Sequence, residues 1–286
     1  MQSRPTAALF LAALIPLLAV PSPLAQDKPA GASADHFQIP ATDEGLPGEG
    51  PIRRQDWFRR LWADRRKAWA GRVEQDQNAV VVLGDSITQG WGNDFTAWFP
   101  GVKIANRGIS GDTSRGVLIR LKEDVLSLHP RAVILLIGTN DLEEKANPET
   151  IAGNLRLILA ALSAHDPKLP VVLCQVFPSS ASKARPADKI RRLNQLCAEV
   201  VHGNPQVTVV ETWPLFADGN GDAIPAEFPD LLHPNQAGYA KWAAALRPVL
   251  ASLGFLEKEP YLFTPEPGFT DRKSTRLNSS HVALSR

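Results

Sequence analysis

Cysteine is scarce in this sequence, since Cys174 and Cys197 are the only two in 286 residues. Neither lies in a Cys-x-x-Cys pair or in a cluster with histidine, so no zinc-binding motif is present. The two thiols could pair in an oxidising compartment, but a sequence does not fix the Cα separation that a disulfide needs. Because Cys174 lies in an apolar, strand-like run and Cys197 on an apolar helical face, we expect two buried free thiols.

An excess of either charge is lacking too. The chain has 31 Lys and Arg against 30 Asp and Glu, and its net charge is +1. A nearly neutral chain has no overall electrostatic attraction for nucleic acid, so we expect no nucleic acid partner. No internal repeat is present, and a hydrophobic content of 44% is enough for one sizeable core.

The N-terminal apolar run, residues 7–20, is shorter than the about 20 residues of a membrane-spanning helix and contains Pro16. Arg4 precedes this run, and small residues and prolines follow it up to Ala25. The pattern is typical of a signal peptide, which we predict at residues 1–25. No cysteine follows the run, so a lipid anchor is not indicated. We expect a secreted or periplasmic protein without a stable membrane span.

Three further segments lie outside the predicted fold or at its borders. Residues 26–50 are rich in Pro, Gly, Ala and Asp without an apolar period, and we predict a linker there. The domain itself is expected at residues 51–257, with a C-terminal extension at residues 258–270. Residues 271–286 begin with DRKSTRLNSSH, which resembles a translated sequencing adapter, and we interpret them as an artefact.

Short apolar runs alternate with helical patterns along the domain. The predicted strands are residues 79–83, 102–105, 132–137, 171–177 and 207–210, and the predicted helices are residues 53–72, 114–128, 148–164, 187–201 and 235–250. Nearly continuous apolar strands are typical of parallel strands that are covered on both faces. The alternation predicts an α/β fold, a three-layer α/β/α sandwich with a central parallel sheet of about five strands.

The helix predicted at residues 53–72 is rich in Trp and Arg, with apolar residues at helical spacing. A basic amphipathic helix could touch a membrane or an acidic polymer. Charge runs of this size are common on ordinary surfaces, so we expect this helix to pack on the core and to leave its basic face in solvent.

Residues with a possible catalytic use follow four of the five predicted strands. Ser86 follows the first, Gly111 the second and Asn140 the third, while Asp230 and His233 come after the fifth and a loop. Active sites of parallel α/β sheets form beyond the carboxyl ends of the strands. We therefore expect these five residues to meet there.

Serine is a weak nucleophile that needs a base, and the base needs an orienting partner. We predict that His233 takes the Ser86 proton and that Asp230 holds the His233 tautomer. The backbone N–H groups of Ser86 and Gly111 and the Asn140 amide would form the oxyanion hole, in which one donor contributes ~3–4 kcal/mol to transition-state stabilisation.

Each element alone has another interpretation. The Gly-Asp-Ser turn could bind phosphate in a flavodoxin-like protein, and Gly111 could serve only a turn. Asn140 could cap a helix, Asp230 could pair with a surface arginine, and His233 could be structural. The conjunction of all four elements, in order and at strand ends, favours catalysis.

Together these elements resemble the four sequence blocks of the GDSL-type, or SGNH, hydrolase family. The blocks are Gly84-Asp85-Ser86-Ile87, Ser110-Gly111-Asp112-Thr113, Gly138-Thr139-Asn140-Asp141 and Asp230-x-x-His233-Pro234-Asn235. The resemblance spans about residues 57–250, and Ile in place of the family's Leu after Ser86 is a small departure. Several runs look like the branch that contains the platelet-activating-factor acetylhydrolase catalytic subunits.

The resemblance implies a flavodoxin-like sheet of strand order 2-1-3-4-5, no metal and no cofactor. It also implies a Ser86, Asp230 and His233 triad, an oxyanion hole of Ser86, Gly111 and Asn140, and Asp85 in a supporting place. The second glycine of the G-x-S-x-G elbow is missing after Ser86, unlike in the α/β-hydrolase fold. The predicted function is hydrolysis of short-chain acyl esters, acetyl first, in small or polysaccharide-linked substrates. A non-catalytic carbohydrate-binding domain of the same fold is the alternative.

For a few further features we expect a structural role and not a functional one. Trp91 and Phe95 could line an acyl pocket, but packing is the expected role. Arg107 and Arg115 could contact an anionic leaving group, but we expect helix capping or a surface position. Residues 218–222 resemble the start of a calcium loop whose Gly and Glu are misplaced, and we expect a turn.

Overall fold

The computed structural model describes residues 34–257. The predicted signal peptide, the start of the predicted linker, the C-terminal extension at residues 258–270 and the adapter-like residues 271–286 lie outside this range. A short 3-10 helix, η1 (Ala34–Phe37), opens the described range, and the compact domain begins at Phe37. Within the described range, no helix combines the length and apolar character needed to cross a membrane.

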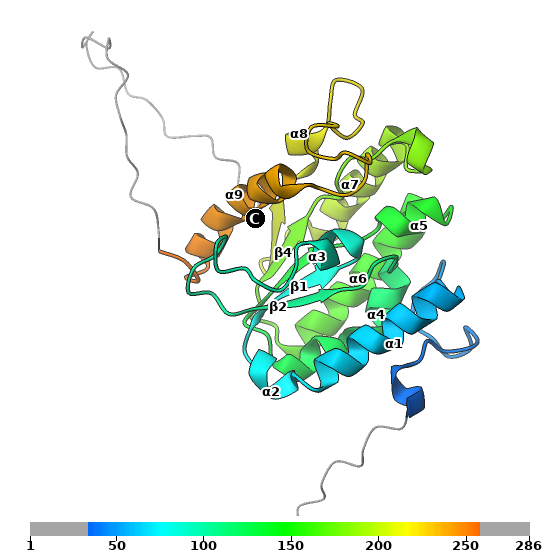
Figure 1. Ribbon diagram of the computed structural model, residues 1–286, viewed down its shortest axis with the longest axis vertical. Helices are drawn as coiled ribbons and strands as arrows, with labels where there is room; N and C mark the ends of the chain where they lie inside the picture. Colours follow the sequence, from blue (N-terminus) through cyan, green and yellow to red (C-terminus); the bar gives the residue numbers. More distant parts are fainter. Residues whose placement is uncertain (1–33, 258–286) are drawn as a thin grey trace, which may run out of the picture. The chain divides into compact units, whose positions relative to one another are not determined.

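Within residues 34–257, five strands alternate with helices (Figure 1). The strands are β1 (Val80–Gly84), β2 (Ile104–Gly108), β3 (Ala132–Leu136), β4 (Val171–Cys174) and β5 (Val207–Val210). The helices are α1 (Asp56–Ala70), α2 (Val73–Asp76), α3 (Ser86–Gly90), α4 (Ser114–Asp124), α5 (Thr139–Glu143), α6 (Pro148–His165), α7 (Ala187–Val201), α8 (Trp213–Phe216) and α9 (Gln236–Ser252), with 3-10 turns η2 (Leu126–Leu128) and η3 (Ala181–Lys183). The predicted strands and long helices are confirmed, with ends that differ by a few residues.

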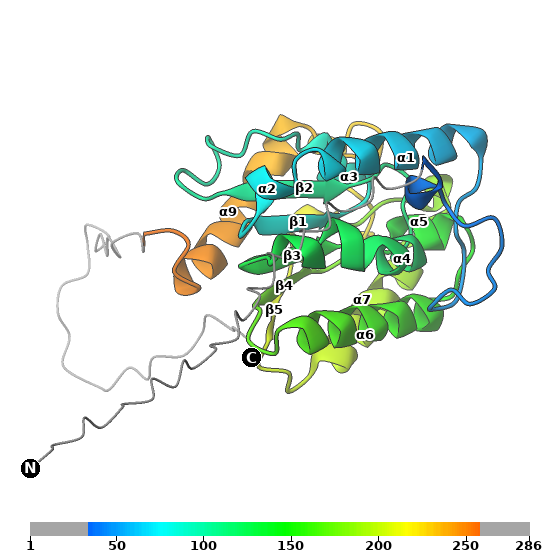
Figure 2. The same ribbon diagram turned by 90° about the horizontal axis from the view of Figure 1, so that it is seen from below.

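All five strands are parallel, and their order is β2-β1-β3-β4-β5. Figure 2 shows the strands stacked in this order, with α1 and α2 beside β2 at one end of the sheet. The expected α/β/α class, strand number and strand order are therefore confirmed. β2 lies on one side of β1, and β3, β4 and β5 follow on the other side. The chain therefore reverses its direction along the sheet at β1 and β3, and ligands bind at such a switch point in sheets of this kind.

The two faces of the sheet bury different apolar layers, because neighbouring strand residues point to opposite sides. Val80, Val82 and Ile134 face a layer built mainly by α3, α8, α9 and the aromatic loop after α3. Val81 and Leu135 face α4, α6 and the end of α7. Burial on both faces explains why the strands are nearly continuous apolar runs.

Helix α1 packs on the end of the sheet as expected. Phe58, Trp62 and Trp69 form its buried stripe and contact Ile109 after β2. Arg60 and Lys67 are exposed, Arg59 and Arg65 are half-buried, and Arg66 is 4% exposed. Arg66 forms ion pairs with the carboxylates of Glu123 and Asp124 in the last turn of α4. The helix is therefore held to the domain by buried charge as well as by apolar contact.

The described part of the predicted linker is attached to the domain. Ile39 is buried in the cluster of α1, and the Asn154 amide of α6 exchanges two hydrogen bonds with the backbone of Glu49. Arg115 of α4 donates to an aspartate and two backbone carbonyls of the same segment. The ordered domain thus begins before residue 51, the boundary that composition predicted, because long-range polar contacts hold a segment that has no apolar period.

Candidate active site

The turn from β1 to α3 places Ser86 at the first position of a helix. Asp85 is the N-cap of this helix, and its Oδ1 accepts the Ile87 N–H at 3.0 Å. A β-carbon on Gly84 would lie 2.3 Å from the Leu136 carbonyl oxygen, so the strand pair leaves room only for glycine before this turn. Backbone N–H groups and the helix dipole at such a start favour a developing negative charge.

Ser86, His233 and Asp230 form a continuous hydrogen-bonded line. His233 Nε2 lies 2.9 Å from Ser86 Oγ, and His233 Nδ1 lies 2.7 Å from Asp230 Oδ2. The other Asp230 oxygen accepts the backbone N–H groups of His233 and Leu232, at 2.7 and 3.0 Å. The structure therefore brings together the three residues of the predicted triad across 147 residues of sequence.

These hydrogen bonds also determine the protonation state of the Asp230 carboxyl group. Burial acts to raise the pKa of Asp230, but the backbone and ring hydrogen bonds from His233 and the Leu232 N–H outweigh it and lower the pKa to about 2. An ionised carboxylate only accepts hydrogen bonds, so Nδ1 of His233 carries the proton. The Nε2 lone pair then faces the Ser86 hydroxyl, which is the arrangement a general base needs.

The loop between Asp230 and His233 has an unusual backbone. Leu231 has φ 60°, a left-handed conformation that side chains with a β-carbon rarely adopt. Its carbonyl accepts the Ser179 hydroxyl at 2.7 Å, which ties the loop to the segment after β4. A left-handed residue with external support is common at functional sites, where the surrounding structure outweighs the strain.

Gly111 and Asn140 come together through the backbone of Asp112. The Asn140 Nδ2 donates to the Asp112 carbonyl at 2.9 Å, so α5 is tied to the loop that follows β2. Gly111 has φ 88°, and a β-carbon there would lie 2.7 Å from the Trp57 ring, so conformation and space both require glycine. The two predicted oxyanion donors thus belong to adjoining, mutually bonded segments.

Arg185 is a residue of the site that the sequence did not reveal. It is 2% exposed in the loop before α7, and its Nη2 donates to Asn140 Oδ1 at 3.1 Å. It also donates to the Thr139 carbonyl at 3.0 Å and to Glu143 Oε2 at 2.8 Å. Because Arg185 occupies the amide oxygen, the Asn140 nitrogen is oriented the other way, and one of its two hydrogens remains beyond the bond to Asp112.

Glu143 links this arginine to the segment that leads into helix α1. Its carboxylate also pairs with Arg53, which further binds Glu144 at 2.8 Å. Burial acts to raise the pKa of Glu143, but the two arginines outweigh it and lower the pKa. No local pattern marks Arg53, Glu143 or Arg185 as part of a site, because the paired arginines and glutamates lie 42 to 91 residues apart in sequence.

Two buried carboxylates hold the loops of the site from beneath. Asp141 accepts both the backbone N–H and the hydroxyl of Ser114, with Oγ to Oδ1 at 2.6 Å. Asp112 pairs with the fully buried Arg120 at 2.8 Å. Burial raises the pKa of each of these two carboxyl groups to about 6, although Ser114 and Arg120 act against it.

Asp85 is the third buried carboxyl group of the site. Burial raises its pKa to about 7, although the Ile87 N–H acts against it. Its Oδ2 has no hydrogen-bond partner in the described part of the chain. Asp85 therefore lies directly before Ser86 as the cap of its helix, and its supporting role stays a prediction.

The expectations of structural roles had mixed outcomes. Trp91 and Phe95 pack in the core, with Trp91 stacked on Trp242 at 4.2 Å between centroids, as expected. A surface position was the wrong expectation for Arg107 and Arg115, because both are buried, but Arg107 does cap a helix, since it donates to the Asp124 carbonyl at the end of α4. Arg107 and Arg115 also donate to the carboxylates of Asp76 and Asp43. Their long side chains satisfy buried acceptors that would otherwise remain unpaired.

Of two further expectations, the turn at residues 218–222 is confirmed, whereas the two buried free thiols are confirmed in full for Cys174 and only in part for Cys197. Cys174 and Cys197 are free thiols, the first fully buried and the second partly. Burial raises the pKa of each to about 12, although Trp242 acts against it at Cys174. Residues 218–222 form a turn in which Asp218 Oδ1 accepts the N–H groups of Asn220 and Asp222.

A parallel α/β/α sheet with a serine and a histidine in hydrogen-bond contact beyond its strand ends is typical of serine hydrolases. Residues 82–241, more than half of the chain, match the GDSL-like Lipase/Acylhydrolase family, and the protein belongs to this family.

Known relatives agree with this membership. The chain is 26% identical over 196 residues to the platelet-activating factor acetylhydrolase IB subunit alpha1 of Bos taurus, covering 67% of this chain and 83% of that protein. It is 26% identical over 203 residues to the human alpha2 subunit, covering 70% and 86%. The solved structure of a GDSL-like lipase from Bacteroides thetaiotaomicron is similar, with a TM-score of 0.56, 27% identity and coverage of 68% of this chain and 97% of that one.

Proposed function

We propose that this protein hydrolyses short-chain acyl esters, acetyl esters foremost, with Ser86 as nucleophile, His233 as general base and Asp230 as the orienting carboxylate. The observation that carries the proposal is the unbroken line from Asp230 through His233 to Ser86 Oγ, at 2.7 and 2.9 Å. A serine and base within hydrogen-bond reach, with the base oriented by a third group, is the arrangement that activates a hydroxyl.

In the first half of the reaction, Ser86 Oγ attacks the ester carbonyl carbon while its proton moves to His233 Nε2. The imidazolium that forms keeps its Nδ1–H on Asp230, whose ionised carboxylate stabilises the charge. Collapse of the tetrahedral intermediate breaks the bond to the alcohol oxygen, and Nε2 returns its proton to that oxygen. The alcohol leaves, and the acyl group remains on Ser86.

In the second half, His233 Nε2 takes a proton from water, which attacks the acyl carbon. The intermediate collapses, the Ser86 oxygen recovers the proton, and the carboxylic acid is released. In both halves the carbonyl oxygen gains negative charge. The Ser86 and Gly111 N–H groups and the remaining Asn140 amide hydrogen are the donors we assign to it. The orientation of the Asn140 amide by Arg185 supports this assignment.

The preference for short acyl groups rests on two observations. The mammalian relatives at 26% identity are named as acetylhydrolases. In addition, Trp91 and Phe95, the aromatic residues after the nucleophile helix that could have lined a long acyl pocket, are packed in the core. Small esters and acetylated polysaccharides both present such groups on an accessible alcohol.

The test compares 4-nitrophenyl acetate, butyrate and octanoate as substrates of the wild type and of Ser86→Ala. Ser127→Ala, at an exposed serine in η2, is the matched control. We expect the acetate to be turned over fastest, with kcat at least ~10³-fold lower in Ser86→Ala and unchanged in Ser127→Ala. Equal turnover by Ser86→Ala, or failure of the folded wild type to react with a fluorophosphonate, would rule the proposal out and favour a non-catalytic binding domain.

We also propose that the protein is exported. The support is the N-terminal pattern of Arg4, an apolar run and a small residue at Ala25. Expression in a bacterial host with and without residues 1–25, followed by cell fractionation, tests this proposal. Retention of the full-length chain in the cytoplasm at the level of the shortened chain would contradict it.

A further inference from the structure

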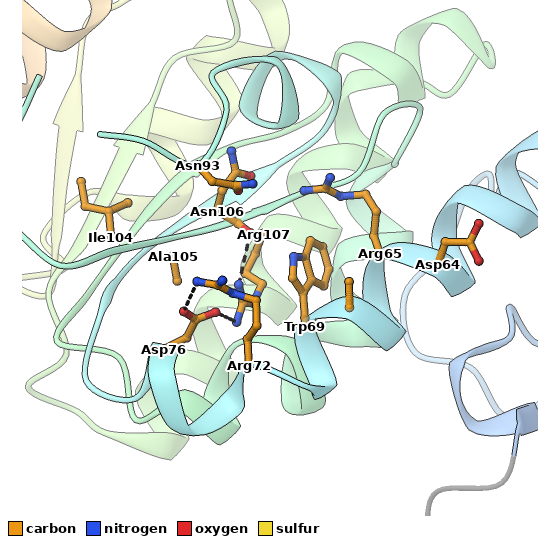
Figure 3. Close-up of a pocket in the computed structure, with 11 residues that line it drawn as sticks. Asp64, Arg65, Trp69, Arg72, Asp76, Asn93, Ile104, Ala105, Asn106 and Arg107 are labelled. Atoms are coloured by element: carbon orange, nitrogen blue, oxygen red, sulfur yellow. Dashed lines mark hydrogen bonds and ion pairs between the residues drawn. The ribbon is translucent and has the colours of Figure 1, made fainter. Parts of the chain in front are cut away.

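A pocket lies beside the edge strand β2, and its lining contains none of the triad residues. It has a volume of about 280 Å³, and its walls come from α1, α2, β2 and the loop after α3 (Figure 3). The side chains that matter here are Arg65, Trp69, Arg72, Asp76 and Asn93.

Arg65 lacks an anionic partner in the described part of the chain. It forms no ion pair there, and its buried Nε has no hydrogen-bond acceptor. Its guanidinium carbon lies 5.0 Å from the Trp69 ring centroid, and Figure 3 shows the side chain reaching into the pocket from α1. The neighbouring cations are better compensated, because Arg72 and Arg107 both bind Asp76, at 3.2 and 2.8 Å.

The electrostatics around Arg65 indicate a local excess of positive charge. Burial, together with the positive charges of Arg120 and Arg107, lowers the pKa of Arg65 to about 10, so the group is still charged at neutral pH. Both oxygens of Asp76 are already bound by arginines, and Asp64 lies exposed at the rim. An uncompensated, half-buried guanidinium favours an anion strongly, because charge-assisted hydrogen bonds gain strength where water is partly excluded.

We propose that this pocket binds a small oxyanion, a sulfate, phosphate or carboxylate group, on the guanidinium of Arg65. Arg72, which is 56% exposed, and the Asn93 amide supply further donors at the mouth. The volume of about 280 Å³ is at the lower end of ordinary ligand sites, which begin near ~300 Å³, and fits one charged group or one acidic sugar. The oxyanion is either a free inorganic ion or the carboxylate of a uronic acid.

The test measures thermal unfolding of the full chain in rising sulfate, phosphate or glucuronate, with chloride at equal ionic strength as reference. A ligand that binds only the folded state raises Tm in a saturable way, by roughly 5–10 °C at about 100 times its Kd. We expect saturation with at least one oxyanion in the wild type and no saturable rise in Arg65→Gln. Arg60→Gln, which removes an exposed arginine of the same helix, is the matched control and should behave as the wild type.

The arms of the experiment separate the sources of the anion. A rise with sulfate or phosphate only indicates an inorganic ion, and a rise with glucuronate at lower concentration indicates an acidic sugar. A rise that grows linearly without saturation, or one that persists in Arg65→Gln, would overturn the proposal. A cooperative unfolding transition of Arg65→Gln without added oxyanion shows that the variant is folded, so the result of the binding test is independent of the proposed function. Ester hydrolysis by Arg65→Gln should equal that of the wild type.

Discussion

Asp230 and His233 lie three residues apart on one exposed loop, whereas Asn140 is buried and held by segments far away in sequence. The side chains of Asp230 and His233 are 47% and 43% exposed, and their contact needs only local geometry. Asn140 is 3% exposed, and its amide is positioned by Arg185 and by the Asp112 backbone. After the roles that we propose for them, we call these the proton-transfer half and the oxyanion half of the site.

Because of this difference, substitutions in the two halves should affect activity and stability to different extents. A substitution in the proton-transfer half removes a function from a solvated loop and leaves the core intact. A substitution in the oxyanion half, or beneath it, breaks buried polar contacts that also hold loops together. The two halves therefore predict different ratios of lost activity to lost stability.

The largest expected effect is on activity, from His233→Ala. Without the base, kcat for 4-nitrophenyl acetate should fall by roughly 10⁴-fold or more, because the serine hydroxyl is no longer activated. The midpoint of urea unfolding should stay close to that of the wild type, since the ring is 43% exposed. His202→Ala, at an exposed histidine beyond α7, is the matched control. A large loss of stability in His233→Ala would remove the distinction between the halves.

The next effect is on stability, from Asp112→Ala. This change removes the nearer carboxylate partner of the fully buried Arg120 and leaves only the longer ion pair with Asp124 at 3.7 Å, and breaking such a buried pair typically costs ~3–5 kcal/mol of unfolding free energy. The exposed pair of Arg192 and Glu149 offers the contrast, because Glu149→Ala should cost less than ~1 kcal/mol. Urea unfolding of the three proteins measures both values, and equal losses would contradict the role of burial.

The local features of this molecule could be read from the sequence. Apolar runs predicted the strands, because burial on both faces leaves no polar positions. The serine, glycine, asparagine and histidine of the site all follow strands, and parallel topology gathers such ends at one edge of the sheet. Asp230 and His233 were recognisable as a pair because their contact spans three positions.

The long-range polar contacts could not be read in this way. Arg107, Arg115 and Arg185 are buried, although arginine is ordinarily exposed, and each depends on acceptors supplied by other segments. Residues 38–50 look like a linker in composition, and the polar contacts of Arg115 and Asn154 hold them on the domain. Pairing between distant charged residues leaves no periodic trace in a single sequence.

A finer test of the oxyanion half concerns Asn140 and Arg185. Asn140→Ala should lower kcat by ~10²–10³-fold, the usual result of removing one oxyanion donor. Arg185→Lys should lower kcat by roughly 10-fold, because lysine cannot reproduce the planar set of donors that orients the amide. The KM for a small ester should change little in either variant.

A double variant distinguishes positioning from a general structural effect. If Arg185 acts through Asn140, the Arg185→Lys effect on kcat should largely vanish in the Asn140→Ala background. A purely structural role would lower kcat by the same factor in both backgrounds. Multiplicative effects would therefore contradict the assignment of Arg185 as a positioning residue.

The smallest expected effect is a pH dependence of stability that comes from beneath the nucleophile. Burial raises the pKa of Asp85 from its ordinary value of 3.8 to about 7, so the folded state holds a proton there that the unfolded chain has already lost. Because the folded state binds more protons between about pH 4 and 7, this group makes the protein less stable as the pH rises through that range. Asp230, whose pKa is lowered to about 2, contributes its stability above its ordinary value of 3.8 and loses it only as the pH falls toward 2.

Asp85→Asn keeps the helix cap, since asparagine also accepts the Ile87 N–H, but it has no proton to lose. Relative to the wild type, the variant should therefore gain stability between pH 5 and pH 8, on the order of 1–3 kcal/mol. Urea unfolding of both proteins at pH 5 and pH 8 gives the difference in free energy of unfolding between variant and wild type at each pH, and the change in this difference is the expected effect. A constant difference between the two proteins would mean that Asp85 is ionised throughout, with its charge compensated by the site. The buried Asp85 carboxyl group would then be ionised in the folded state, as the exposed Asp230 carboxyl group is.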